Sequence, residues 1–280
     1  MRDQAVNSIP EIDITATSPW YAIQLADLWR YRELLYFLAW RDIKVRYKQT
    51  ALGIAWVLLQ PLLTMILFSL IFGQLAGLPS GGVPYPLFVL AALIPWQLFA
   101  YALTQSSNSL VADQSLVTKI YFPRIVIPVS SVLAGTLDFA ISFILFLILM
   151  LIYGLPFTWR LAMLPICALL ALFTAISVGL WLSALNVKYR DVRYALSFLT
   201  MLWMFATPIA YSSTLIPQQW QLLYSLNPMV GVVEGFRWAL LGIDYVVGPI
   251  VLVSTLVVMI LLTGGLIYFK HIENSFADVI

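Results

Sequence analysis

The chain has 280 residues, of which 62% are hydrophobic and 10% are charged, and its formal net charge is +2. Globular domains carry about 45–50% apolar and about 25% charged residues, so this composition excludes an ordinary soluble domain. With one cysteine and one histidine in the sequence, we expect no internal disulfide, no metal site and no catalytic triad.

Four long stretches contain no Lys, Arg, Asp or Glu. Each is longer than the roughly 20 residues that an α-helix needs to cross a bilayer. The sequence therefore predicts an all-α polytopic membrane protein. The four uncharged stretches are 49–112, 161–187, 194–233 and 245–269.

Residues 1–22 are polar and lack the apolar region of a cleaved signal peptide, so we interpret them as an N-terminal tail. In residues 23–50, apolar side chains recur at spacings of three and four, and charged side chains fill much of the other face. This pattern predicts an amphipathic helix in the membrane interface. A helix packed on a soluble partner is the alternative. The expected anchoring residues are Trp29, Trp40, Arg41, Lys44 and Arg46.

Apolar runs separated by turn residues predict a transmembrane domain of six spans over 51–270. Clustered Gly and Pro in 77–86 divide the first uncharged stretch into two spans, and 153–160 separates the third span from the fourth. The predicted spans are about 51–75, 86–112, 128–153, 161–186, 194–213 and 247–269, followed by a C-terminal tail at 271–280.

A basic and aromatic island, 116–127, lies between the second and third spans. Lys119, Tyr121, Phe122 and Arg124 are of the types that dominate protein interfaces, so the segment is a candidate anchor for a partner protein. The alternative is that the two cations only set the membrane topology.

Asp138 is the clearest ionisable residue inside a predicted span. If the third helix begins near Pro128, ten residues at 1.5 Å each place Asp138 roughly 15 Å into the bilayer. A functional acid and a carboxyl group that is hydrogen-bonded to a neighbouring helix are both compatible with this position.

Residues 214–242 are too apolar for an ordinary loop, yet Pro and Gly interrupt them. Asn227 as N-cap and Pro228 as first helical residue predict a short helix with Glu234 and Arg237 paired on one face. Two re-entrant helices on the outer side fit this segment. The candidate channel or gate residues are Tyr211, Trp220, Tyr224, Glu234, Phe236, Arg237 and Trp238. The aromatic ones could instead belong to interfacial belts.

With the N-terminus inside, thirteen Lys and Arg residues lie on the inner side and two, Arg160 and Arg237, on the outer side. The positive-inside rule therefore predicts that both termini are cytoplasmic. The sequence contains neither a Walker A motif nor a dinucleotide fingerprint, so we expect no nucleotide site in this chain.

Several blocks, in order and spacing, resemble the membrane permease of type-2 ABC exporters, and more narrowly the branch that exports O-antigen, capsular polysaccharide or teichoic acid. These blocks are "AWRDIKVRYKQTALGIAWVLLQPL" (39–62), "LIPWQLFAYALTQSSNSLV" (93–111), "LVTKIYFPRIVIP" (116–128), "NVKYRDVRYAL" (186–196) and "SLNPMVGVVEGFRWALLG" (225–242).

The resemblance implies a homodimer in the bacterial inner membrane that works with two copies of a separate ATPase, which would bind ATP and Mg. The substrate would be a lipid-linked polysaccharide, and nothing indicates a nucleic-acid partner. In that family, 116–127 would be the coupling segment, and Arg190 and Asp191 would form a second cytoplasmic contact.

Two other functions remain open. One is an ABC exporter of a drug or a small lipid. The other is an ion-coupled secondary transporter in which Asp138 carries the proton, although the inverted repeat common in such transporters is not evident.

Overall fold

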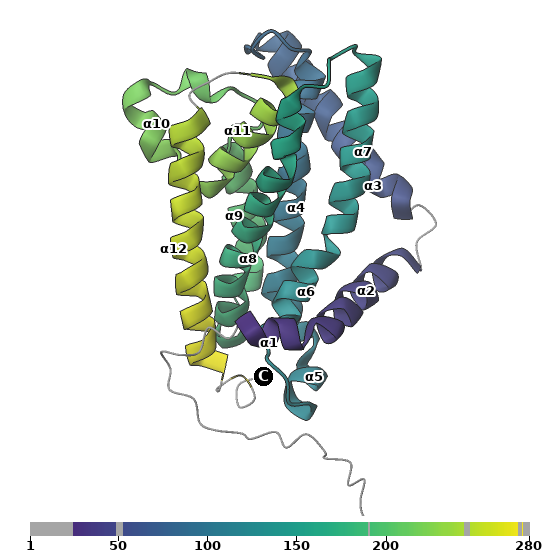
Figure 1. The fold of residues 1–280 in the computed structure, drawn as a ribbon, viewed down its shortest axis with the longest axis vertical. Helices are drawn as coiled ribbons and strands as arrows, with labels where there is room; N and C mark the ends of the chain where they lie inside the picture. Colours follow the sequence, from purple (N-terminus) through teal and green to yellow (C-terminus); the bar gives the residue numbers. More distant parts are fainter. Residues whose placement is uncertain (1–24, 49–52, 190, 244–246, 274–275, 277–280) are drawn as a thin grey trace, which may run out of the picture.

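The computed structural model describes residues 25–48, 53–189, 191–243, 247–273 and 276 (Figure 1). All regular structure among these residues is helical, as the sequence predicts. In chain order the elements are α1 (Leu25–Arg30), α2 (Arg32–Lys48), α3 (Gly53–Phe68), the π-helical η2 (Ser69–Leu75), α4 (Tyr85–Ala112), α5 (Gln114–Lys119), α6 (Val126–Ala134), α7 (Thr136–Ile152), the 3₁₀-helical η3 (Trp159–Met163), α8 (Leu164–Lys188), α9 (Val192–Phe205), the 3₁₀-helical η4 (Ser213–Leu215), α10 (Gln218–Tyr224), α11 (Pro228–Leu241) and α12 (Val247–Glu273).

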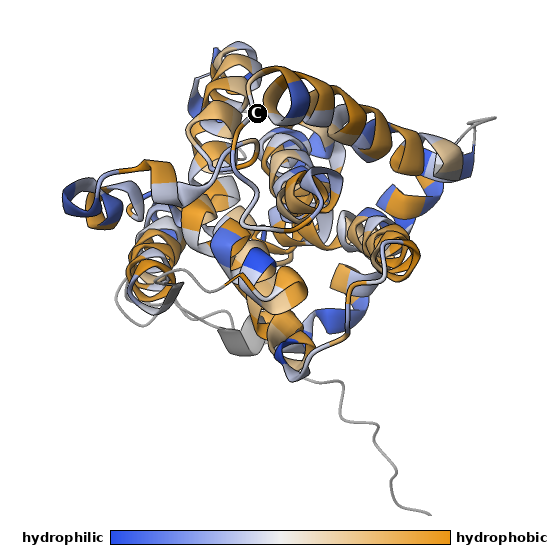
Figure 2. Cartoon of the chain, turned by 90° about the horizontal axis from the view of Figure 1, so that it is seen from above, coloured by the Kyte–Doolittle hydropathy of each residue, from blue (hydrophilic) through white to orange (hydrophobic). Residues whose placement is uncertain are grey.

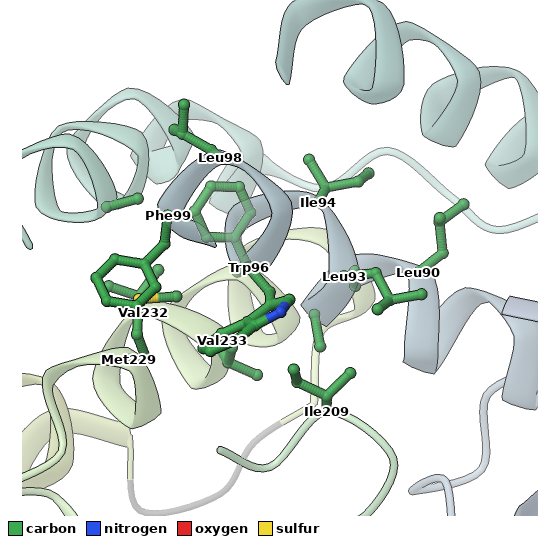
Figure 3. Packing of buried hydrophobic residues seen from close by; sticks show 14 of the residues in the cluster. Leu90, Leu93, Ile94, Trp96, Leu98, Phe99, Ile209, Met229, Val232 and Val233 are labelled. Carbon is green, nitrogen blue, oxygen red and sulfur yellow. The ribbon is translucent and has the colours of Figure 1, made fainter. Parts of the chain in front are cut away.

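Helix α4 forms the centre of the bundle. In its most apolar window 78% of the residues are buried, whereas the corresponding windows of the other long helices are 22–28% buried. Figure 3 shows Trp96 and Phe99 of α4 packed near Met229 and Val232 of α11. Figure 2 shows hydrophobic segments along most of the helices. The other long helices therefore present much of their apolar surface outward, as a protein surrounded by lipid must.

The bundle has two ends that carry different elements. The α5 end carries α5 and the last turn of α12, and the α10 end carries α10 and the first turn of α4 (Figure 1).

Five helical segments are long and apolar enough to span a membrane: Ala55–Leu75, Tyr85–Ala112, Val126–Ile152, Trp159–Lys188 and Gly248–Glu273. The predicted span 194–213 differs, because its helix, α9, has 14 residues and a length of roughly 21 Å at 1.5 Å each. The chain continues beyond α9 without a long helix, and the Tyr85 hydroxyl donates a hydrogen bond to the Ala210 carbonyl at the α10 end. The count of six spans stays a prediction.

The predicted third span is built from two helices, α6 and α7, that are separated at Gly135. A Cβ atom at Gly135 would lie 2.7 Å from Cδ1 of Tyr101, so glycine lets the chain approach α4 closely at this break. The break places Asp138 in the first turn of α7.

Small residues also bring α8 and α12 close to their neighbours. A Cβ atom at Gly179 would lie 2.6 Å from the Ser106 hydroxyl oxygen of α4, and one at Gly231 would lie 2.4 Å from Cβ of Ser254 on α12. Close approach of small residues is the usual basis of helix association in membranes. It makes α4, α8, α11 and α12 a tightly packed unit.

Candidate functional site

At the α10 end, Asn227 and Pro228 start α11 as the sequence predicts. The Asn227 Oδ1 accepts the Met229 N–H at 3.1 Å, and Pro228 is in the first turn. The same oxygen accepts the indole N–H of Trp203 at 2.8 Å, and the amide nitrogen donates to the Ala206 carbonyl at 3.1 Å. Asn227 thus joins the end of α9 to the start of α11.

Helix α11 also contains the predicted charge pair. Arg237 Nη1 lies 3.2 Å from Glu234 Oε1, and the two side chains are 0% and 1% exposed. Arg237 also donates to the Ile209 carbonyl at 2.8 Å and to the Tyr211 carbonyl at 3.2 Å. Its guanidinium carbon lies 3.6 Å from the centre of the Phe88 ring. The pair therefore joins α11, α4 and the segment after α9 in one buried contact.

The tyrosines among the gate candidates lie together. The Tyr211 and Tyr224 hydroxyl oxygens are 2.8 Å apart, and the Tyr211 hydroxyl donates to the Phe205 carbonyl at 3.0 Å. Trp220 on α10 is 53% exposed. These residues link α10 to the end of α9 and leave Trp220 on the surface.

The remaining aromatic candidates lie deeper. Phe236 is 0% exposed and packs at 6.0 Å, centre to centre, on Phe139. Trp238 packs edge-on at 6.1 Å against Trp159, and the Arg160 guanidinium lies 5.4 Å from its ring centre. Phe236 is therefore a core residue in this chain, whereas the sequence suggested a candidate for the channel surface.

At the α5 end, the island 116–127 divides into an exposed part and a buried part. Lys119 and Tyr121 are exposed, Tyr121 to 80%, and Ile120 between them is 56% exposed. Phe122 is 7% exposed and belongs to an apolar cluster with Leu38 of α2 and with residues of α6, α8 and α12. The surface that a partner could contact is therefore smaller than expected from the sequence.

Arg124 is bound within the chain. Its backbone N–H donates to Glu273 Oε1 at 2.9 Å, and its guanidinium donates to the Glu273 backbone carbonyl. Lys270 Nζ lies 2.7 Å from Glu273 Oε2. Glu273 could not be identified from the sequence as a partner of Arg124, because the two are 149 residues apart and no local pattern connects them.

Arg41 connects α2 to the root of the island. Its guanidinium donates to both carboxylate oxygens of Asp113, at 2.9 and 2.7 Å, and to Asp42 Oδ1 at 2.8 Å. Asp113 stands between α4 and α5. The hydrogen bond to Asp113 raises the pKa of the Arg41 guanidinium, while burial raises the pKa of the Asp42 carboxyl group. Asp113 is a second counter-ion that the sequence analysis did not single out.

Asp138 is paired with the end of α2. Arg46 Nη1 lies 2.5 Å from Asp138 Oδ2, and the Tyr47 hydroxyl donates to Asp138 Oδ1. The Arg46 guanidinium lies 4.3 Å from the centre of the Tyr101 ring. The structure therefore favours a hydrogen-bonded, paired carboxylate over an isolated acid.

The orientation of α2 differs from the prediction. Its cations Arg41 and Arg46 turn towards acids of the bundle, whereas Trp40 is 44% exposed and Trp29, on the preceding α1, is 73% exposed. Lys44 Nζ lies 5.5 Å from the centre of the Trp40 ring. The reason is tertiary, because the partners of the two arginines lie on other helices. Exposed aromatic rings on α2 still suit a membrane interface.

The second predicted cytoplasmic contact is described in part. Arg190 lies outside the described residues. Asp191 is exposed, and its carbonyl accepts the N–H groups of Tyr194 and Ala195 at 3.0 and 3.1 Å, at the start of α9.

Residues 33–241 match the family described as ABC-2 type transporter. The chain belongs to the ABC-2 type transporter family. The matched region begins in α2 and ends with α11, so it contains the island, the Asp138 pair and the Glu234 pair. The chain is therefore a multi-pass membrane protein of a transporter family, and its role is that of a transport subunit.

Among curated proteins, the chain is similar to an O-antigen export system permease protein, RfbA, of Myxococcus xanthus. The two are 32% identical over 215 residues, which is 75% of this chain and 81% of the relative. An RfbA of Klebsiella pneumoniae is 29% identical over 256 residues, 89% of this chain and 95% of the relative. The polysialic acid transport protein KpsM of Escherichia coli is 25% identical over 215 residues, 72% of this chain and 78% of the relative.

Proposed function

We propose that this chain is the channel-forming permease of an ATP-driven exporter that moves a lipid-linked polysaccharide, similar to O-antigen, across the bacterial inner membrane. The observation that carries the proposal is the similarity to O-antigen export permeases over most of both chains. The working unit is a homodimer of this chain with two copies of a separate ATPase, which binds ATP and Mg.

The α5 end faces the cytoplasm, and so do both termini. Thirteen Lys and Arg residues on this side against two on the other support this orientation. Lys119, Ile120 and Tyr121 then form an exposed knob on the side where ATP is available. A large aromatic residue at the centre of a small exposed surface is typical of interface hot spots.

Two contacts transmit a displacement of this knob to the bundle. Asp113, at the root of α5, is held by Arg41 of α2, and Arg124, after the knob, is held by Glu273 of α12. Buried Phe122 keeps the knob rigid relative to both contacts. Movement imposed on Tyr121 therefore reaches α2 and α12 together.

Helix α12 continues this connection to the outer side. The Ser254 hydroxyl accepts the Gly231 N–H of α11 at 3.2 Å and donates to the Ser225 carbonyl, after α10, at 2.8 Å. Tyr211 and Tyr224 join α10 to the segment after α9. In the proposed exporter, α10 and α11 form the outer gate, and α12 links it mechanically to the ATPase side.

The test is to replace Tyr121 with Ala and to purify the permease together with its ATPase from cells. We expect weaker co-purification, altered ATP hydrolysis and less surface polysaccharide at an unchanged level of inserted permease. Tyr153→Ala, an exposed tyrosine at the opposite end of the bundle, is the matched control. Normal co-purification and normal surface polysaccharide in Tyr121→Ala would sink the proposed coupling contact.

A further inference from the structure

Three glutamines lie on the long apolar helices that border one cavity. Gln60 is on α3, and Gln97 and Gln105 are on α4. Within the described part of the chain, no hydrogen bond joins the side-chain amides of these three residues to another residue. Hydrocarbon offers no hydrogen-bond partner, and an unsatisfied amide there is costly. Gln60 and Gln105 are exposed and Gln97 is half-buried, so these amides are open to a partner from outside this chain, and a polar partner suits them better than lipid.

The cavity has a volume of about 390 Å³, which falls within the roughly 300–1,000 Å³ of ligand sites. On α3, Trp56, Gln60 and Thr64 line it at intervals of four residues, which places them on one face of the helix. Trp56 is 59% exposed, and its indole ring lies one helical turn from Gln60 on the same face of α3. Because Pro61 has no N–H, the backbone carbonyl of Val57 lacks its usual hydrogen bond within the helix, and Val57 also lines the cavity.

On α4, Gln97, Tyr101 and Gln105 repeat the same interval, and Thr104 lies beside them. From Gln97 to Gln105 this row runs roughly 12 Å along the helix at 1.5 Å per residue. The cavity is thus lined from two helices by rows of amide, hydroxyl and aromatic side chains. Amides donate and accept hydrogen bonds, and so do the hydroxyl groups of a sugar.

Among the described residues that line the cavity, none carries an unpaired charge. Its charged residues are Arg46 and Asp138, which form an ion pair at 2.5 Å. An adjoining cavity of about 530 Å³ towards the α5 end shares Arg46, and its Arg41 is paired with Asp42 and Asp113. A negatively charged glycan would find no unpaired cation among the described residues of this surface to offset its charge. A neutral glycan needs only hydrogen-bonding side chains, and the surface supplies them.

We infer that the rows on α3 and α4 bind the transported glycan, and that the glycan suited to this surface carries no charge in its repeat. This inference rests on the proposed function and adds the substrate class. Because hydrogen-bonding side chains recur at successive turns along both rows, successive sugars can exchange equivalent hydrogen bonds as the chain moves. No single position holds it tightly.

The first test replaces Gln60, Gln97 and Gln105 together with Leu in the full-length permease in cells. Three net hydrogen bonds of about 0.5–1.5 kcal/mol each correspond to a loss of roughly tenfold or more in surface glycan. Co-purification with the ATPase and the oligomeric state should be unchanged. The control is Gln74→Leu, because Gln74 is exposed on η2 and is not among the residues that line the cavity.

The second test is the sugar composition of the glycan that disappears from the cell surface when the permease gene is deleted. Neutral sugars throughout the repeat are expected. A uronic acid, sialic acid or phosphate in every repeat would overturn the inferred specificity. Normal export by the triple variant would overturn the inference that these rows bind the glycan. Loss of the dimer in the triple variant would also overturn it, because the amides would then be a contact between subunits. No change of surface glycan on deletion would instead contradict the proposed function itself.

Discussion

The two ends of the bundle both rely on ion pairs, but they bury them differently. The Glu234–Arg237 pair at the α10 end is 0–1% exposed. At the α5 end, Arg41 and Asp113 are 32% and 19% exposed; Arg46 and Asp138, where the end of α2 meets the first turn of α7, are 38% and 18% exposed. Breaking a buried pair typically costs about 3–5 kcal/mol, whereas exposed pairs contribute roughly 0.2–1 kcal/mol.

This difference indicates different mechanical roles. Arg237 holds α11 to α4 and to the segment after α9 through buried contacts, so this pair acts as a brace between those three segments. Arg41 contacts two acids at once and is within reach of water, so it can exchange partners when α5 moves. In the proposed exporter, the cytoplasmic side would have adjustable ion pairs, and the buried pair would keep α11 fixed to α4 and to the segment after α9.

Breaking the buried Glu234–Arg237 pair should have the largest effect on stability. Arg237→Met leaves Glu234 buried without its cation, and we expect a loss of about 3–5 kcal/mol in the stability of the folded permease. The measurement is thermal unfolding in detergent together with the level of inserted protein. Exchanging the two charges should not rescue it, because an arginine at 234 would lose the carbonyl contacts of Arg237. Full rescue by the exchange would show that the charge pair alone matters.

Phe122→Ala should have the second-largest effect on stability, and it tests the contrast between the buried and exposed parts of the island 116–127. Truncating a buried phenylalanine costs about 3–5 kcal/mol in a well-packed core, and at the rim of this cluster we expect a loss near the low end of that range. Tyr121→Ala, one residue away, should change the unfolding temperature little because its side chain is 80% exposed. Equal destabilisation by both variants would contradict the division of the island.

Breaking the Arg41–Asp113 ion pair should reduce export more than it reduces stability. Arg41→Met removes a partly exposed pair with hydrogen bonds of about 1.5–3 kcal/mol at most, and we expect a modest fall in unfolding temperature but a clear loss of surface polysaccharide. Arg41→Lys should rescue poorly, since lysine cannot bind both carboxylate oxygens as the guanidinium does. The measurement compares surface polysaccharide with the level of inserted protein. A contact that only stabilises the fold would lower both together.

Asp138→Asn should have the smallest effect. The amide keeps the shape and can still accept the Tyr47 hydroxyl, so the loss should stay within roughly 1 kcal/mol for a partly exposed pair. Surface polysaccharide should remain close to the wild-type amount. If export stopped while protein level and oligomeric state stayed normal, proton transfer through Asp138 would gain support.

Parts of the site that depend on neighbours in sequence were predictable. Asn227 caps α11, and the Glu234–Arg237 pair forms three residues apart on one helical face, because helix geometry alone brings these groups together. The contacts of Arg41 with Asp113 and of Arg124 with Glu273 were not predictable, since the partners lie 72 and 149 residues away. The contacts of Arg41 and Arg46 with the bundle were missed for the same reason.

The sequence by itself determined the class of protein and most of its helices. Long uncharged stretches can satisfy their backbone groups in a bilayer only as helices, and clustered Gly and Pro end them. Only the tertiary structure decided which way each side chain faces: Phe122 into the core, Arg46 towards Asp138, and Gln60 towards the same cavity as Gln97. Helix periodicity defines the faces of a helix, but packing against other helices selects which face is buried.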